Sequence, residues 1–124
     1  ISVNINTAQP FIHTDKGHFE NIIKNLIENA FKYGGEEVKV QISTGNQGDN
    51  LIITIEDDGI GIPKVHQKKV FDRFYRIVSG NQYNIKGFGI GLYYIRSILN
   101  KMGGKITLES SPGNGAKFII TIKQ

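Results

Sequence analysis

The first part of the fold is decided by residues 19–35, which read FENIIKNLIENAFKYGG. Apolar residues recur there at spacings of three and four, which places them on one stripe of an α-helix. The stripe consists of Phe19, Ile22, Ile23, Leu26, Ile27 and Ala30. Asp15 suits the N-cap of this helix, and Gly34-Gly35 suits its end. We therefore expect a long helix with one face against a core.

Alternating apolar and polar residues predict strands on both sides of this helix. Ser2–Ile5 alternates weakly and is expected to be an edge strand. Two hairpins are expected after the helix, the first with its turn at Gly45–Asn50 and the second with its turn at Ser111–Gly115. The alternating positions are Val38, Val40 and Ile42, then Leu51, Ile53 and Ile55, then Ile106 and Leu108, and finally Phe118, Ile120 and Ile122.

Two more helices are expected between the hairpins. Pro63 suits the first turn of a short helix reaching about Arg73. A second long helix runs from Ile90 to a stop at Gly103-Gly104, after a loop from Tyr75 to Phe88. The order β-α-β-β-α-loop-α-β-β indicates an α+β fold in two layers. A mixed, mostly antiparallel sheet is covered by helices on one face.

Composition indicates one ordinary globular domain. The chain has 124 residues, of which 39% are hydrophobic, and a net charge of +4. It contains no Cys, which excludes disulfides and thiolate metal sites, and no apolar run of the ~20 residues that a membrane span requires. Because it begins at Ile1 without an initiator Met or a signal pattern, we expect residues 1–124 to be one domain from a longer protein.

Glycine is the unusual feature of the composition. The chain has 15 glycines in 124 residues, whereas proteins average about 7%. They cluster beside the periodic segments, where glycine marks tight turns or close approach of the backbone to a ligand.

The first helix carries an unusual polar set. Asn25, Asn29 and Lys32 share a face roughly opposite the centre of the apolar stripe. This set fits a solvated face and a ligand site about equally well. In the second case an amide oxygen would coordinate Mg²⁺, Lys32 would meet a phosphate, and Tyr33 could stack on a base.

A second candidate segment, Asp57-Asp58-Gly59-Ile60-Gly61-Ile62-Pro63, follows a strand. A carboxylate at the strand end can accept a hydrogen bond from the amino group of adenine, whereas guanine presents a carbonyl there. Gly59 and Gly61 would let the backbone approach the ring. An Asp-Gly turn explains only part of this pattern, because we expect Ile60 and Ile62 to be buried.

A third candidate segment, Gly87-Phe88-Gly89-Ile90-Gly91-Leu92, opens the second long helix. Alternate glycines leave backbone N–H groups free to face an anion at the helix N-terminus. The long loop before it excludes a dinucleotide-binding fingerprint, and GxxxxGK[ST], HRD and DFG motifs are absent.

A fourth segment, residues 70–76, is rich in aromatic side chains and arginine. We expect Phe71 to belong to the core. Phe74 and Tyr75 are expected nearer the loop, where they could dock against a partner.

Together and in this order, these segments resemble the catalytic and ATP-binding domain of sensor histidine kinases, over residues 10–124. Residues 25–33 resemble its asparagine box, residues 57–63 and 87–92 its two glycine boxes, and residues 70–76 its phenylalanine box. Ser111–Gly115 resembles its last glycine turn. The resemblance implies the Bergerat two-layer α/β sandwich.

The resemblance also implies roles toward ATP and Mg²⁺. Asn29 would hold the metal with help from Asn25, Lys32 would contact phosphate, Tyr33 would lie on the adenine side, and Asp57 would bind the adenine amine. Residues 72–88 would form the ATP lid. The remaining implied cofactor contacts are Gly59, Gly61, Ile62, Arg76, Lys86, Gly87, Phe88, Gly89, Ile90, Gly91 and Leu92.

Two positions depart from the family pattern. Ala116 stands where Thr is common, so one hydroxyl near the pocket is missing. Phe88 stands where a small residue or Thr is common, which changes the contacts available to the lid.

Kinase chemistry is favoured over ATP hydrolysis. Hydrolases of this fold carry a catalytic Glu one turn before the metal-binding Asn, and here that position is Asn25, an amide that cannot act as a general base. His13, His18 and His66 lack the context of a phosphoacceptor. The acceptor histidine is therefore expected on another domain.

The implied function is phosphotransfer from Mg²⁺-ATP to a histidine on a dimerisation and phosphoacceptor domain, in two-component signal transduction. Expected partners are that domain and a response regulator, with no nucleic acid. The whole protein is expected to be a homodimer, with this domain in the cytoplasm and a membrane anchor elsewhere. An anti-sigma-factor-type serine kinase and a non-catalytic nucleotide sensor of the same fold remain the alternatives.

Overall fold

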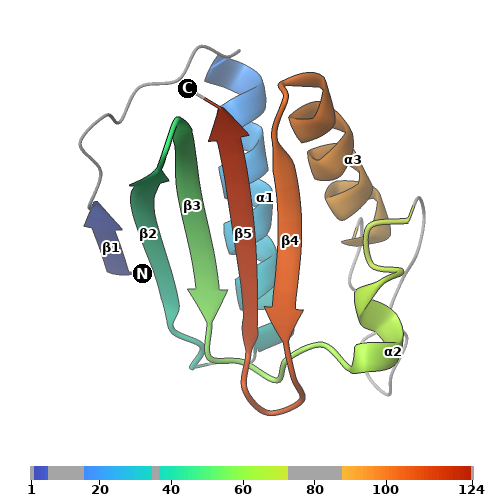
Figure 1. Cartoon of the computed structure of the whole chain (residues 1–124). Coiled ribbons are helices and arrows are strands. Elements are labelled where there is room, and N and C mark those ends of the chain that lie inside the picture. Colours follow the sequence, from blue (N-terminus) through green and yellow to red (C-terminus); the bar gives the residue numbers. More distant parts are fainter. Residues whose placement is uncertain (1, 6–15, 35–36, 73–87, 124) are drawn as a thin grey trace.

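The computed structural model describes residues 2–5, 16–34, 37–72 and 88–123. Five strands form one sheet in the order β1-β2-β3-β5-β4, with the helices behind it (Figure 1). The strands are β1 (Ser2–Ile5), β2 (Val40–Gln47), β3 (Asn50–Asp57), β4 (Lys105–Ser110) and β5 (Ala116–Lys123). The helices are α1 (Lys16–Gly34), α2 (Lys64–Gln67) and α3 (Phe88–Lys101).

The sheet is mixed and mostly antiparallel, as expected. β1 pairs in parallel with β2, whereas the pairs β2–β3, β3–β5 and β4–β5 are antiparallel. β5 lies between β3 and its own hairpin partner β4, which is an edge strand. This arrangement confirms the predicted two-layer α+β fold.

The core lies between the sheet and the long helices. β3 and β5 alternate buried and less buried residues along their length, which puts one apolar face under α1 and α3. α1 packs against α3, β3 and β2, and α3 packs against β4. The most deeply buried side chains are Ile22, Leu26, Val40, Ile55, Val70, Leu92, Ile95, Leu99 and Ile120.

The first hairpin turn is shorter than predicted. Residues 45–47 continue β2, because Gly45, Asn46 and Gln47 pair with Ile52, Leu51 and Asn50. The turn is reduced to Gly48 and Asp49, and Gly48 takes a φ of +60°. Residues 45–50 are polar, so their composition did not predict that the hydrogen-bonded pairing of β2 with β3 continues to Gln47 and Asn50.

The short helix is also shorter than predicted. α2 ends at Gln67, and turns cover Lys68–Phe71 before Asp72, the last described residue of this segment. Pro63 precedes the helix with φ −56° and ψ 143°, so it is the cap residue and lies outside the first turn.

α3 starts two residues before the expected Ile90 and ends as predicted. Gly103 has a φ of +75°, and the N–H of Gly104 donates to the carbonyl of Leu99 at 2.8 Å. None of the helices in the described part of the chain has the length and apolar character needed to cross a membrane.

Phe71 belongs to the core, as expected, with 8% of its surface exposed. Its ring meets Phe118 edge to face at 6.3 Å between centroids, and the guanidinium of Arg96 lies 5.9 Å from its centroid. These contacts tie the segment after α2 to both β5 and α3. Phe74 and Tyr75 lie outside the described residues.

Candidate functional site

The predicted site segments gather at one end of the molecule. The C-terminal end of α1, the end of β3, α2 and the turn between β4 and β5 all lie toward the bottom of Figure 1. α3 starts nearer this end than it finishes. Segments far apart in sequence are thus brought together where the glycine-rich motifs occur.

Asp57, the last residue of β3, presents a half-buried carboxylate at this end. Its Oδ1 accepts hydrogen bonds from the backbone N–H of Gly59 at 2.9 Å and of Ala116 at 3.3 Å. Among the described residues, no group donates to Oδ2. The carboxylate is therefore fixed through one oxygen and offers the other as an acceptor.

Burial raises the pKa of Asp57 above its usual range. The two backbone N–H groups oppose the shift by stabilising the anion, while the neighbouring charges of Asp58 and Glu56 add to it. Desolvation is the largest of these effects. A perturbed carboxylate at a strand end is a typical feature of a ligand site.

Asp58 has a different place, although the two aspartates are adjacent. It is exposed, its Oδ1 accepts from the N–H of Lys39 at 2.6 Å, and its own N–H donates to the carbonyl of Lys39 at 3.3 Å. Asp58 thus ties the start of β2 to the end of β3. Asp57 is therefore the candidate ligand acceptor, because it is half-buried whereas Asp58 is exposed and binds Lys39.

Two glycines allow the loop 58–63 and the turn 111–115 to interlock. Gly61 has a φ of +78°, and a Cβ there would collide with the carbonyl of Ser111. Gly115 has a φ of +72°, and a Cβ there would collide with the carbonyl of Asp57. The N–H of Gly113 donates to the carbonyl of Ile60 at 2.8 Å. Close backbone contact explains both glycines without any ligand.

Ile60 and Ile62 differ in burial. Ile62 is 8% exposed and belongs to the core, as expected, but Ile60 is 52% exposed, so its predicted burial is wrong. The reason is the turn at Gly61, which directs consecutive residues to different sides. The N–H and C=O of Ile62 are both engaged within the protein, which leaves it a supporting place beside the site.

On α1, Asn25 and Asn29 flank the buried stripe and are both partly buried. The Nδ2 atom of Asn29 is buried and has no hydrogen-bond partner, a feature shared in the described structure only with Thr44 Oγ1. A buried, unpaired amide is unfavourable. The predicted position opposite the stripe is wrong, because Asn29 borders the fully buried Ile22 and Leu26.

The other predicted residues are placed by their backbone or lie outside the description. Lys32 and Tyr33 lie on the last turn of α1, and Phe88, Gly89, Ile90 and Gly91 form the first turn of α3. Leu92 is fully buried in the core. Asp15, Arg76, Lys86 and Gly87 lie outside the described residues.

Sequence reasoning missed Ser110 and Gln67. The hydroxyl of Ser110 accepts from the N–H of Ile62 at 2.8 Å and donates to the carbonyl of Gly115 at 2.6 Å. The side-chain amide of Gln67 donates to the carbonyls of Ile62 at 2.8 Å and of Ser110 at 2.7 Å. Neither residue belongs to a recognisable motif, so only the fold reveals them.

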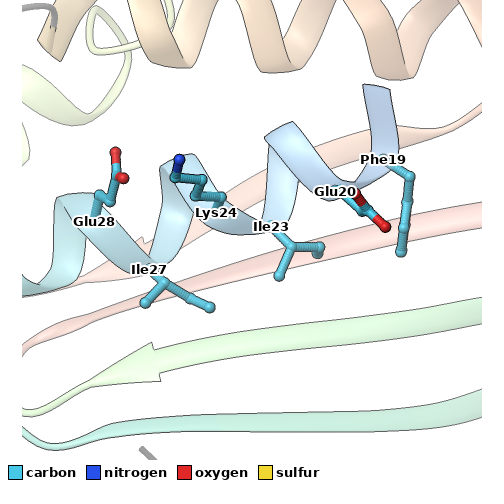
Figure 2. Close-up of a pocket in the computed structure, with 6 residues that line it drawn as sticks. All are labelled: Phe19, Glu20, Ile23, Lys24, Ile27 and Glu28. Atoms are coloured by element: carbon cyan, nitrogen blue, oxygen red, sulfur yellow. The ribbon is translucent and has the colours of Figure 1, made fainter. Parts of the chain in front are cut away.

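Two hollows in the described surface include neither Asp57 nor Asn29 among their lining residues. One of about 440 Å³ is formed along α1 by Phe19, Glu20, Ile23, Lys24, Ile27 and Glu28. Figure 2 shows Phe19, Ile23 and Ile27 on one side of the helix and Lys24 and Glu28 pointing to the other. The second, of about 330 Å³, lies beside the β4–β5 turn and includes Glu56 and Lys117. The candidate site is defined by the carboxylate of Asp57 and the amide of Asn29.

Within the described ranges, no cluster of three or more His, Cys, Asp or Glu side chains could hold a metal ion. A metal at this end would therefore depend on amide oxygens, on water and on the ligand itself. The amide of Asn29 fits that requirement, because its carbonyl oxygen is a hard ligand and its unpaired Nδ2 can donate to a phosphate.

Comparison with known proteins gives consistent matches. Residues 14–124 match the family described as histidine kinase-, DNA gyrase B- and HSP90-like ATPases. The chain is 43% identical over 98% of its length to the sensor protein RprX of Bacteroides fragilis, and 36% identical over 98% of its length to the sensor protein KdpD of Escherichia coli. It spans 24% of RprX and 14% of KdpD.

Solved structures agree on the fold. The catalytic domain of the histidine kinase ThkA superposes with a TM-score of 0.79 at 26% identity, covering 98% of this chain and 78% of that one. The mycobacterial sensor histidine kinase MprB gives a TM-score of 0.83 over 98% of this chain and 82% of its own, and at 21% identity it supports the fold alone.

Proposed function

Because the chain belongs to the family of histidine kinase-, DNA gyrase B- and HSP90-like ATPases, we propose that it binds Mg²⁺-ATP and donates the γ-phosphate to a histidine on a separate domain. One observation carries this proposal: the half-buried carboxylate of Asp57 is fixed through Oδ1, and no described residue donates to its Oδ2. The C-terminal end of α1, the helix that carries the unpaired Nδ2 of Asn29, lies at the same end of the molecule.

Asp57 recognises the base. Its free oxygen accepts a hydrogen bond from the exocyclic amine of adenine, and a guanine carbonyl in the same place would leave two acceptors facing each other. In this proposal Gly59 and Gly61 approach the ring through their backbone, and the carbonyl of Ser111 independently excludes a Cβ at Gly61. Tyr33, on the last turn of α1, lies on the adenine side in this proposal.

Asn29 holds the metal, assisted by Asn25 one turn earlier on the same side of α1. When bound, Mg²⁺ would neutralise charge on the triphosphate. The free Nδ2 of Asn29 donates to a phosphate oxygen, which would satisfy a group that is buried without a partner. Lys32 adds a positive charge one turn further along.

The first turn of α3 faces the phosphates. Gly89 and Gly91 lie in that turn, where backbone N–H groups have no partner within the helix. Arg76, Lys86 and Gly87 are proposed as further phosphate contacts from the preceding segment. Phe88 and Ile90 are proposed as further cofactor contacts of this turn, with Leu92 supporting it from the core.

The proposed acceptor of the γ-phosphate is the imidazole of that histidine, in place of water. In the transfer step a bond forms between the γ-phosphorus and an imidazole nitrogen, while the bond to the bridging oxygen breaks and ADP leaves. Asn25 is an amide and cannot deprotonate water, so hydrolysis lacks a general base at that position. RprX and KdpD are both named sensor proteins.

The remaining proposals concern the whole protein. The chain spans 24% of RprX and 14% of KdpD. We therefore infer that residues 1–124 are one domain of a longer protein. The phosphoacceptor and dimerisation domain would belong to the same polypeptide, which would act as a homodimer. It would phosphorylate a response regulator and keep this domain in the cytoplasm, with a membrane anchor elsewhere.

The test is phosphotransfer in trans. The 124-residue chain is mixed with a phosphoacceptor-helix fragment of a sensor kinase and γ-labelled ATP. We expect acid-labile label on histidine, and no label when the acceptor histidine is replaced. Label on serine would favour an anti-sigma-factor-type kinase, and binding without transfer would favour a nucleotide sensor. Either result would overturn the proposal.

A further inference from the structure

Four hydrogen bonds made by the side chains of Ser110 and Gln67 link the loop 58–63, α2 and the β4–β5 hairpin, next to Asp57. Two of them pass through the hydroxyl of Ser110, which accepts from Ile62 N–H at 2.8 Å and donates to Gly115 C=O at 2.6 Å. The other two come from the side-chain amide of Gln67 on α2, at 2.8 Å and 2.7 Å. Neither Ser110 nor Gln67 is among the residues predicted to contact the nucleotide.

The cluster reaches Asp57 through one peptide group. The carbonyl of Gly115 and the N–H of Ala116 belong to the same planar peptide, so fixing one fixes the direction of the other. The hydroxyl of Ser110 binds the carbonyl side, and the N–H side donates to Asp57 Oδ1 at 3.3 Å. The hydrogen bonds thus form a chain from Ile62 through Ser110 and the peptide to the carboxylate.

Such a chain does two things. Hydrogen bonds in series polarise one another, so each donor becomes stronger. The chain also sets the orientation of the carboxylate plane, because Oδ1 is held between the N–H of Gly59 and the N–H of Ala116. Gly115 makes this possible, since a Cβ at that position would collide with the backbone of Asp57.

We propose that Ser110, supported by Gln67, is a positioning residue for adenine specificity. Ser110 aims the free oxygen of Asp57 by orienting the Gly115–Ala116 peptide. Ala116, which stands where the family often has Thr, takes part through its backbone alone. This inference rests on the proposed role of Asp57 in reading adenine.

Adenine specificity is measured with two ligands, ATP and the triphosphate of purine riboside, which lacks the amino group. The ratio of their dissociation constants reports the hydrogen bond to Asp57 and cancels general effects on the pocket. For the wild-type chain we expect ATP to bind about tenfold more tightly.

Ser110→Ala is expected to lower this ratio to about threefold or less, because the peptide loses its orienting donor. Ser110→Thr keeps the hydroxyl and should restore the ratio. The matched control is Ser111→Ala on the same turn. Ser111 Oγ accepts only from the side chain of Asn114, at 2.9 Å among the described contacts, and its removal should leave the ratio unchanged.

Should Ser110→Ala fail to fold, Gln67→Ala answers the same question, since it removes two of the four bonds and should lower the ratio in the same direction. A wild-type ratio retained in a folded Ser110→Ala or Gln67→Ala variant overturns the positioning role. A ratio near one for the wild-type chain removes Asp57 from adenine recognition. The proposed function would then fail at that point, and this inference with it.

Discussion

Asp57 combines two demands that oppose each other at the level of a single side chain. Burial disfavours its charged form, yet two backbone donors hold it in place as an acceptor. Its Oδ2 has no donor among the described residues, so a bound ligand can supply one. A carboxylate in this state suits ligand recognition better than it suits the stability of the free domain.

Asp57→Asn is predicted to weaken ATP binding by roughly 1–3 kcal/mol, because the single acceptor oxygen of an amide cannot serve both the backbone N–H groups and the adenine amine. Calorimetry with ATP measures the change directly. Asp58→Asn is the matched control, since Asp58 is exposed and serves Lys39. Equal affinity in wild type and Asp57→Asn would remove Asp57 from the adenine role.

Asp57 should also affect how stability depends on pH. Its pKa is raised in the folded protein, so the folded state holds this proton more strongly than the unfolded state does. The stability from this group is therefore present at low pH and lost as the pH rises through the folded-state pKa. Asn at this position does not titrate.

The free energy of unfolding of Asp57→Asn minus that of wild type is therefore predicted to increase with pH. The increase should begin near the ordinary carboxylate range of about pH 4 and level off above the raised pKa. Urea denaturation at a series of pH values measures it. A difference that decreases over this window would show that the shift has the opposite sign.

Asn29→Ala is predicted to abolish Mg²⁺-dependent transfer and to weaken ATP binding more in Mg²⁺ than in chelator. Stability without ligand should stay within about 1 kcal/mol of wild type, because the variant removes a buried donor that has no partner. Asn21→Ala, at an exposed position on the same helix, is the control. Full activity of Asn29→Ala would exclude it from the metal site.

Residue chemistry alone pointed to two residues of the candidate site. Asp57 and Asn29 could be found because a carboxylate after a strand and an amide on an amphipathic helix are unusual in a core element. Ser110 and Gln67 could not, since their importance depends on which carbonyls lie within reach of their side chains. The exposure of Ile60 was also missed, because it depends on the positive φ of Gly61.

At the scale of elements, the site is built from two interlocked backbone segments. The loop after β3 and the turn between β4 and β5 approach so closely that neither Gly61 nor Gly115 has space for a Cβ. Gly113, on the same turn, has open space around it and a similar φ of +82°. The two kinds of glycine can be separated by substitution.

Gly115→Ala is predicted to destabilise the domain by more than Gly113→Ala. Both variants lose the favourable glycine conformation, at about 1–2 kcal/mol. Only Gly115→Ala adds a collision with the backbone of Asp57, and it should also reduce ATP affinity. Thermal unfolding and calorimetry on both variants test this. Equal losses of stability would mean that the close approach is unimportant.

Element boundaries were harder to predict than element types. All eight elements occur in the predicted order, since apolar periodicity depends on the chain alone. The end of β2 was misplaced because the residues at 45–47 are polar yet continue the ladder with β3. Pairing with a neighbouring strand stabilises such residues, and the composition of one segment does not reveal it.

At the scale of the whole molecule, the fold provides two packed layers and gathers the candidate site segments at one end. The sheet and the two long helices share the core, and the site segments are the connections at one end of that core. The sequence order of helices and hairpins was enough to predict this layering. The parallel pairing of β1 with β2 was not predictable from β1, whose alternation is weak.

Calorimetric titration of the folded 124-residue chain with a non-hydrolysable ATP analogue tests the central claim most directly. With Mg²⁺ present, a saturable one-site heat of binding is expected, and it should weaken when Mg²⁺ is replaced by chelator. A well-folded sample that gives no heat of binding under either condition would contradict the account of a site formed by Asp57, Asn29 and the glycine segments.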